Sequence, residues 1–123
     1  MSHGGFLRQQ SDDPELASHM MHDYTKADLD PQTRGMLDYA VKLAKKPASM
    51  EKGDVEKLRS LGLSDEQILS TVLITAYFNV MNRLANALGV EVPPGRQEAQ
   101  EKWMSKEAAS QEWLMGKKVP SKA

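Results

Sequence analysis

The stretch from Asp65 to Leu88 constrains the fold of this chain more than any other segment, because its apolar residues recur every three or four positions. Ser64 and Gln67 have the spacing of a capping box, in which each side chain bonds to the other residue's backbone N–H group. Gly89 is a typical helix-terminating residue. The pattern predicts one long helix, apolar over much of its circumference, that belongs in a core or a subunit interface. Its apolar positions are Ile68, Leu69, Val72, Leu73, Ala76, Tyr77, Val80, Met81, Leu84, Ala85 and Leu88.

The rest of the chain has helical spacing too, and no segment shows the strict alternation that is typical of a strand. Asp13-Pro14 and Asp30-Pro31 are helix starts, because Asp is a good N-cap and Pro fits the first helical position. We therefore predict an all-α protein. The further helices are expected over residues 4–10, 14–24, 31–45, 51–60 and 96–115.

The segment Val92-Pro93-Pro94-Gly95 interrupts the helical pattern and suggests a boundary. We predict a helical domain over residues 1–92, followed by a polar helix and a frayed tail over residues 93–123. Trp103 and Trp113 lie in that polar helix, and they are expected to anchor it on a neighbouring subunit.

Composition excludes several classes of function. The chain has 16 Lys and Arg against 17 Asp and Glu, a net charge of -1, which argues against a nucleic-acid partner. It has no cysteine, so it holds no disulfide, no thiolate metal site and no thiol nucleophile. The N-terminal residues lack the apolar region of a signal peptide, and no apolar run approaches the ~20 residues of a membrane span. We expect a cytoplasmic protein without a membrane partner.

Glu15, His19 and His22 lie four and three residues apart, which places them on one face of the expected 14–24 helix. Imidazole and carboxylate groups at this spacing can hold a metal ion. The alternative is an ordinary solvated helix face, and the sequence favours it because no further acidic ligand is evident. We predict neither a metal nor a cofactor.

Asn79, Asn82 and Arg83 interrupt the long apolar helix. Buried polar groups need hydrogen-bond partners, so we expect bonds between helices or subunits, with contact to a substrate as the less favoured alternative. Tyr39 and Tyr77 are candidates for lining a pocket, although aromatic residues at this spacing are usually part of the core.

The long helix offers more apolar surface than the shorter, more polar helices before it can cover. Val72, Ala76 and Val80 lie on one side of it, and Ile74 and Phe78 on another. A surface helix of a small monomer needs a single apolar stripe. Because large exposed apolar patches usually mark interfaces, we predict a homo-oligomer.

Three segments together resemble one known family. They are SHGGFLRQQSDDPELA at residues 2–17, LDPQTRGMLDYAVKLAKKP at 29–47 and LSDEQILSTVLITAYFNVMNRLANALGVE at 63–91. In order and spacing they resemble the peroxidase-related branch of the alkylhydroperoxidase-D-like (AhpD-like), carboxymuconolactone-decarboxylase-like superfamily. The resemblance implies an all-α, AhpD-like helical bundle that is oligomeric, of which this chain is the C-terminal portion.

The resemblance also implies a catalytic motif of the form E-x11-C-x2-C-x3-H. His3 matches its histidine, and the peroxide-attacking cysteine would stand four residues earlier, before Met1. The chain thus begins inside the motif and lacks both cysteines. His3 is the single catalytic candidate, as a proton relay or the remnant of one. The alternative is a terminal histidine without a role.

Two classes of function remain open, and with them whether the chain is an enzyme. One is a peroxidase-related protein of antioxidant defence, which acts on a small hydroperoxide only if an upstream dithiol exists. The other is a non-catalytic oligomeric helical protein. A cysteine-independent, decarboxylase-like enzyme with His3 as acid or base is a further alternative. Met1 as an internal start, a natural truncation or a fragment each account for the missing cysteines, and the DNA upstream distinguishes between them.

Overall fold

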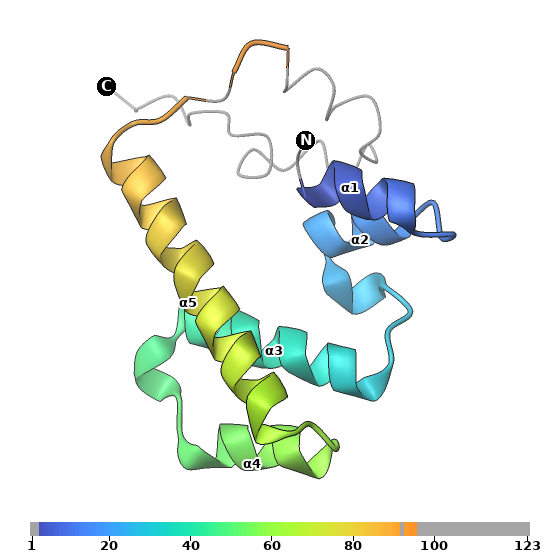
Figure 1. Cartoon of the computed structure of the whole chain (residues 1–123), viewed down its shortest axis with the longest axis vertical. Coiled ribbons are helices and arrows are strands. Elements are labelled where there is room, and N and C mark those ends of the chain that lie inside the picture. Colours follow the sequence, from blue (N-terminus) through green and yellow to red (C-terminus); the bar gives the residue numbers. More distant parts are fainter. Residues whose placement is uncertain (1–2, 92, 96–123) are drawn as a thin grey trace. The chain divides into compact units, whose positions relative to one another are not determined.

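The computed structural model describes residues 3–91 and 93–95, and this part of the chain is helical without a strand (Figure 1). The predicted all-α class is confirmed. The α1–α2–η1 segment belongs to one compact unit, and residues 29–90 form a second. Most of the expected 93–123 segment, including both Trp residues, lies outside the described residues. The elements in chain order are α1 (His3–Gln10), α2 (Leu16–His22), η1 (Tyr24–Lys26), α3 (Pro31–Lys45), η2 (Pro47–Ser49), α4 (Lys52–Ser60) and α5 (Asp65–Ala87).

The start signals of α3 and α5 act as predicted. Asp30 caps α3, since its Oδ1 accepts a hydrogen bond from Thr33 N at 2.9 Å and its Oδ2 accepts one from Thr33 Oγ1 at 2.6 Å. These bonds to the ionised carboxylate lower the pKa of Asp30. At α5, Gln67 N donates to Ser64 Oγ at 3.2 Å and Ser64 N donates to Gln67 Oε1 at 2.9 Å. This is the predicted capping box.

Helix α2 is shorter than the predicted 14–24 span at both ends. Its N-cap is Glu15, because Asp13 Oδ1 accepts from Glu15 N at 2.9 Å and forms a turn that delays the helix. At the other end Asp23 is extended, and its carboxylate accepts from Thr25 N at 3.0 Å. That bond caps η1. The hydroxyl bond from Thr25, and after it this backbone bond, lower the pKa of Asp23. The side chain of Asp13 therefore delays the start of α2, and that of Asp23 ends the helix early by capping η1.

The core of the 29–90 unit lies at the turn between α4 and α5. Gly62 has φ +88°, a conformation that favours glycine, and its N–H group bonds to Arg59 O at 2.9 Å. Leu63 N bonds to Leu58 O at 3.2 Å, which completes a Schellman motif. The turn thereby brings Leu58 and Leu63 together in the core. The buried hydrophobic residues of this core are Leu58, Leu63 and Ile68, packed against Met36, Tyr39, Val55 and Leu61.

Helix α3 packs closely against the turn between α4 and α5. Gly35 is buried, and a Cβ atom on it would overlap Leu61 Cδ1. Gln32 Nε2 donates to Leu61 O at 2.9 Å. The absence of a side chain at Gly35 therefore allows α3 to pack against the α4–α5 turn, and one side-chain bond ties the two together.

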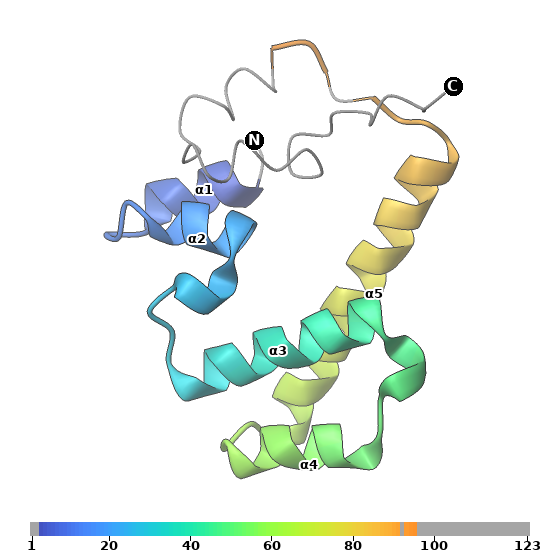
Figure 2. The same ribbon diagram turned by 180° about the vertical axis from the view of Figure 1, so that it is seen from behind.

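Helix α5 crosses α3, and the C-terminal half of α5 projects beyond α3 and α4 in both views (Figures 1 and 2). Ile68 is its single buried residue. Leu73, Ile74 and Tyr77 are each about 60% exposed. The prediction that this helix offers more apolar surface than its neighbours cover is confirmed, while the predicted oligomer stays a prediction.

The sequence-based statement about membrane spans needs a correction. As a helix of 23 residues, α5 is long and apolar enough to cross a membrane by length and composition alone, with a mean hydropathy of 1.2. Core helices of soluble proteins meet the same two criteria. The length of α5 therefore gives weak evidence, and the expectation of no membrane partner stays a prediction.

Candidate functional site

His3 is the first residue of α1, and its side chain is exposed. The helix HGGFLRQQ contains no buried residue, and it packs against α2 within its own unit. An exposed imidazole at a helix start is accessible to a proton donor or acceptor. This is the position that the family resemblance assigns to the motif histidine, and its role stays a prediction.

The three residues of the candidate metal face lie on and before α2. Glu15 is exposed at the N-cap, while His19 and His22 are partly buried within the helix. Among residues 3–91 and 93–95, no group of three His, Asp or Glu side chains is placed so that it could hold a metal ion. The geometry of the described residues therefore gives no support to a metal site here.

The polar residues of α5 bond within their own helix. Asn79 Nδ2 donates to Thr75 O at 3.0 Å, Thr75 Oγ1 donates to Thr71 O at 2.7 Å, and Thr71 Oγ1 donates to Gln67 O at 2.9 Å. We call Thr71, Thr75 and Asn79 the α5 ladder. The expectation of a bond between helices or subunits is wrong for this bond of Asn79, whose acceptor lies one turn back along α5.

Asn82 continues the ladder side of α5 and lines a groove with α3. The groove holds about 240 Å³ and is lined mainly by apolar surface. Because Thr75 Oγ1 and Asn79 Nδ2 donate to carbonyl groups of α5, these polar residues can face the apolar side chains of α3. The lining residues are Leu37, Ala40, Val41 and Ala44 from α3, and Thr75, Phe78, Asn79 and Asn82 from α5.

The two candidate tyrosines have different environments. Tyr39 packs against the Leu58 core and also lines a hollow between α3 and α4. Tyr77 is 60% exposed, and its ring meets Phe78 edge to face at a centroid distance of 5.6 Å. The interpretation of Tyr77 as a core residue is therefore wrong for the described structure.

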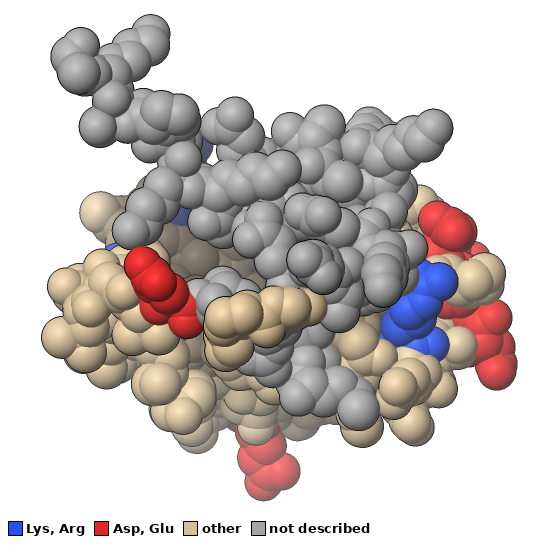
Figure 3. Space-filling model, turned by 90° about the horizontal axis from the view of Figure 1, so that it is seen from above, with Lys and Arg blue, Asp and Glu red and all other residues tan. Residues whose placement is uncertain are grey.

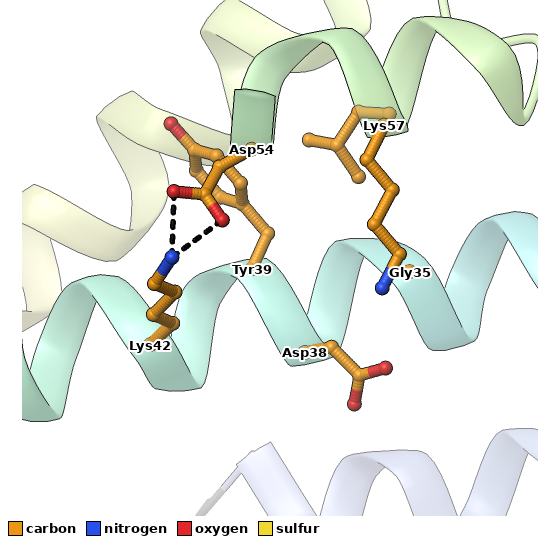
Figure 4. A pocket seen from close by; sticks show the side chains of 7 residues that line it. Gly35, Asp38, Tyr39, Lys42, Asp54 and Lys57 are labelled. Carbon is orange, nitrogen blue, oxygen red and sulfur yellow. Dashed lines mark hydrogen bonds and ion pairs between the residues drawn. The ribbon is translucent and has the colours of Figure 1, made fainter. Parts of the chain in front are cut away.

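The hollow between α3 and α4 contains an ion pair that sequence reasoning missed (Figure 4). Lys42 Nζ lies 2.7 Å from both carboxylate oxygens of Asp54, and Glu51 N donates to Asp54 Oδ2 at 2.9 Å. The Lys42 bond is the largest cause that lowers the pKa of Asp54. The hollow holds about 90 Å³, with Tyr39 and Lys57 also on its wall. Since Asp54 both pairs with Lys42 and caps α4, we interpret the pair as structural.

In the sequence, the three-residue spacing from Glu51 to Asp54 is the one feature that indicates where Asp54 of this ion pair lies. Acidic side chains three residues apart at a helix start form a capping box here, which fixes Asp54 at the first turn of α4. The identity of its lysine partner depends on how α3 packs against α4. Helical periodicity does not contain that information.

Acidic and basic side chains are mixed on the face of the molecule seen from above, and neither gathers among the described residues there (Figure 3).

Several solved structures are similar to this chain, and two of them are described here. An uncharacterized peroxidase-related protein from Silicibacter sp. TM1040 has a TM-score of 0.68 at 38% sequence identity, and the match covers 75% of this chain. An uncharacterized peroxidase-related protein from Ralstonia eutropha JMP134, described as an alkylhydroperoxidase AhpD core, has a TM-score of 0.65 at 37% identity over the same share. No family model and no curated protein matches the chain.

These similarities define the class of protein as an all-α, AhpD-like fold. More particularly, the neighbours are peroxidase-related proteins, so the predicted resemblance to peroxidase-related, AhpD-like proteins is confirmed. The decarboxylase-like relationship and the catalytic motif that includes His3 stay predictions. The chain spans 48% of the length of each neighbour.

Proposed function

We propose that these residues are the helical scaffold of an AhpD-like protein that acts in the reduction of alkyl hydroperoxides. The observation that carries the proposal is the combination of 38% identity with a TM-score of 0.68 to a peroxidase-related protein. Since the match covers about half of that neighbour, the proposal concerns the contribution of these residues to such a site. The dithiol would come from residues other than these 123.

The chemistry sets what these residues can contribute. Reduction of a hydroperoxide to an alcohol and water consumes two electrons, which a dithiol supplies as it becomes a disulfide. The attacking group is a thiolate, and this chain has no cysteine. His3 can hold or deliver a proton near neutral pH. We therefore propose that His3 serves proton transfer and that the 123-residue chain alone does not reduce peroxides through thiols.

The first test is an assay of the chain as it stands. An organic hydroperoxide and a dithiol reductant are mixed with the protein, and peroxide consumption is followed after treatment with a metal chelator. We expect no consumption above that of buffer. Turnover well above buffer would contradict the proposal and would indicate a chemistry carried by His3 or the tyrosines.

The second test supplies the missing motif. An N-terminal extension places C-x2-C so that the second cysteine stands four residues before His3. We expect peroxide consumption to appear, and to disappear when the second cysteine is replaced by serine. His3→Ala in the extended chain tests the imidazole, and a reduced rate with unchanged helix content is the expected result. An extended chain that folds and stays inert would contradict the scaffold proposal.

A non-catalytic helical protein is the second candidate, favoured by the absence of cysteine and by the apolar surface of α5. A cysteine-independent, decarboxylase-like enzyme using His3 is a further alternative. If the chain extended with C-x2-C folds and stays inert, that result would favour the non-catalytic helical protein. For either function we propose a cytoplasmic protein without nucleic-acid partners, and the near-neutral net charge of -1 supports the absence of a nucleic-acid partner.

A further inference from the structure

Helix α1 carries His3, and its own sequence makes it a weak helix. It has eight residues, and two of them are glycines, Gly4 and Gly5. Isolated helices shorter than about 12–15 residues are marginal in water, and glycine is the least favourable helical residue after proline. No acidic residue stands in the first turn of α1 to complement the helix dipole. Helix α1 therefore depends on its packing against α2, which belongs to the same unit.

Within α1, Leu7 is the one residue whose side chain is not exposed. Gly4 and Gly5 are also partly buried, but they have no side chain to pack. Phe6 is the other large apolar residue of α1, and it is 59% exposed. The remaining side chains of α1 are exposed as well. Side-chain packing of α1 therefore rests on Leu7.

The covered face of α1 consists of Leu7 and small residues. Gly4, Leu7 and Ser11 recur at intervals of three and four residues, which places them on one face, and all three are partly buried. Ser11 N donates to Leu7 O at 3.0 Å, so this face continues to the end of the helix. On α2, the two residues that are buried are small as well, Ala17 and Ser18. Small residues on both helices allow a close approach.

His3 lies one turn before Leu7 on the same side of α1. Residues four apart are neighbours on a helix surface, and a leucine side chain in a helix points back toward the preceding turn. The Leu7 side chain is therefore directed toward the turn that begins with His3. Regions with few buried apolar side chains open at a low free-energy cost while the rest stays folded. Removal of the Leu7 side chain should therefore release the turn that carries the imidazole.

We propose that Leu7 is the positioning residue for His3, because it is the side chain that holds α1 against α2. When α1 opens, His3 leaves its place while residues 29–90 stay folded around Leu58 and Ile68. The proposal rests on the proposed function in one respect, which is that His3 serves proton transfer. Leu7 acts through the helix that carries the imidazole.

Hydrogen exchange followed by NMR tests this anchoring in the chain as it stands. The amide of Ser11 bonds to Leu7 O and reports on α1, and the amide of Ile68 bonds to Ser64 O and reports on residues 29–90. We expect Leu7→Ala to speed exchange of the Ser11 amide at least about tenfold and to leave that of Ile68 unchanged. Phe6→Ala is the matched control, since it removes an exposed apolar side chain from the adjacent position, and it should change neither amide.

Equal exchange rates of the Ser11 amide in Leu7→Ala and Phe6→Ala would overturn the proposal, because Leu7 would then not be the anchor. An unprotected Ser11 amide in the wild type would overturn it too, since α1 would not be held at all. If Leu7→Ala also exposes the Ile68 amide or fails to fold, Leu7 supports the whole chain, which contradicts a role confined to α1.

The ring signals of the three histidines test whether His3 follows α1. In Leu7→Ala we expect the Hε1 signal of His3 to move to its position in a free peptide. In Leu7→Met it should keep the wild-type position, because methionine has a similar volume. A His3 signal that stays in place in Leu7→Ala would overturn the positioning role.

The chain extended with C-x2-C tests the consequence for peroxide reduction. We expect Leu7→Ala to lower kcat at least about tenfold, and Leu7→Met and Phe6→Ala to retain it. A full rate in Leu7→Ala with a rapidly exchanging Ser11 amide would overturn the proposal. If the extended chain is inert, the proposed function fails, and the exchange and ring-signal measurements still decide the role of Leu7.

Discussion

Gly35 and Gly53 are both helical glycines, and their surroundings predict opposite effects of adding a methyl group. A Cβ atom at position 35 would overlap Leu61 Cδ1, whereas one at position 53 would meet Glu51 Oε1 at an ordinary 3.7 Å. Overpacking costs about 1–3 kcal/mol, and exchanging Gly for Ala in a helix returns about 1 kcal/mol. We expect Gly35→Ala to lower the free energy of unfolding by about 1 kcal/mol.

Gly53→Ala is the control for this prediction. With no overlap, the helix-propensity gain should raise the free energy of unfolding by up to about 1 kcal/mol. Urea denaturation of both variants measures the difference. Equal stabilisation by the two substitutions would mean that Leu61 moves aside without cost and that Gly35 does not set the approach of α3.

Asp54 predicts a pH dependence of stability. Its folded pKa lies below the ordinary value of 3.8, chiefly because of the Lys42 bond. A carboxylate with a lowered folded pKa stabilises the fold above its unfolded pKa, and this contribution is lost as the pH falls through the folded value. We expect Asp54→Asn to lower the melting temperature at pH 7, and the difference from wild type to shrink below pH 3.8.

Asp28→Asn removes an exposed carboxylate elsewhere and serves as the comparison. Thermal melts at a series of pH values should separate the two variants at neutral pH and bring them together in acid. A difference for Asp54→Asn that stays constant down to pH 2 would show that the Lys42 pair does not contribute through its charge.

At the scale of the element, we expect a charge introduced on the ladder side of α5 to destabilise the fold more than a charge at an exposed position beyond the end of the helix. Val72 is half-buried and lies one turn before Thr75 on the ladder side. An unpaired carboxylate there is partly removed from water, and we expect Val72→Asp to lower the free energy of unfolding by about 2 kcal/mol. Val90→Asp, at a position 67% exposed beyond the helix, should change it by less than about 0.5 kcal/mol. Chemical denaturation measures both variants. An unchanged free energy of unfolding for Val72→Asp would show that this side of α5 is solvated.

The helices whose boundaries were predicted correctly have local start signals. Asp30 before Pro31, and Ser64 with Gln67, act through bonds to residues within three positions. The start of α2 was placed too early because the carboxylate of Asp13 can cap a helix or close a turn, and a sequence does not decide between them.

The candidate site was less accessible from the sequence for the same physical reason. Lys42 and Asp54 are twelve residues apart and meet only because α3 packs against α4. The acceptor of Asn79 was misassigned because periodicity identifies a polar residue on a helix face without identifying the carbonyl that it reaches. Interactions across helices depend on packing, which a one-dimensional pattern does not record.

At the scale of the whole molecule, the described residues form a small core, and Leu58 is the one large side chain among them that is fully buried. If the predicted homo-oligomer covers exposed apolar residues of α5 such as Leu73 and Leu84, folding and association are coupled, and the melting temperature rises with protein concentration. We expect such a rise for wild type and none for Leu73→Glu. Calorimetry over a hundredfold dilution series measures it, and a concentration-independent wild-type transition would contradict the coupling.

The α5 ladder affects how α3 and α5 can move against each other. Thr71, Thr75 and Asn79 take their acceptors from α5 itself, so a small slide or rotation of one helix past the other would break none of these bonds. Resistance to sliding in this groove comes from the shapes of Leu37, Ala40, Val41, Ala44 and Phe78. The position of α3 against α5 therefore depends on the sizes of the apolar side chains in the groove. Substitutions that enlarge Ala40 or Ala44 should shift it, whereas exchange of the polar ladder residues should not.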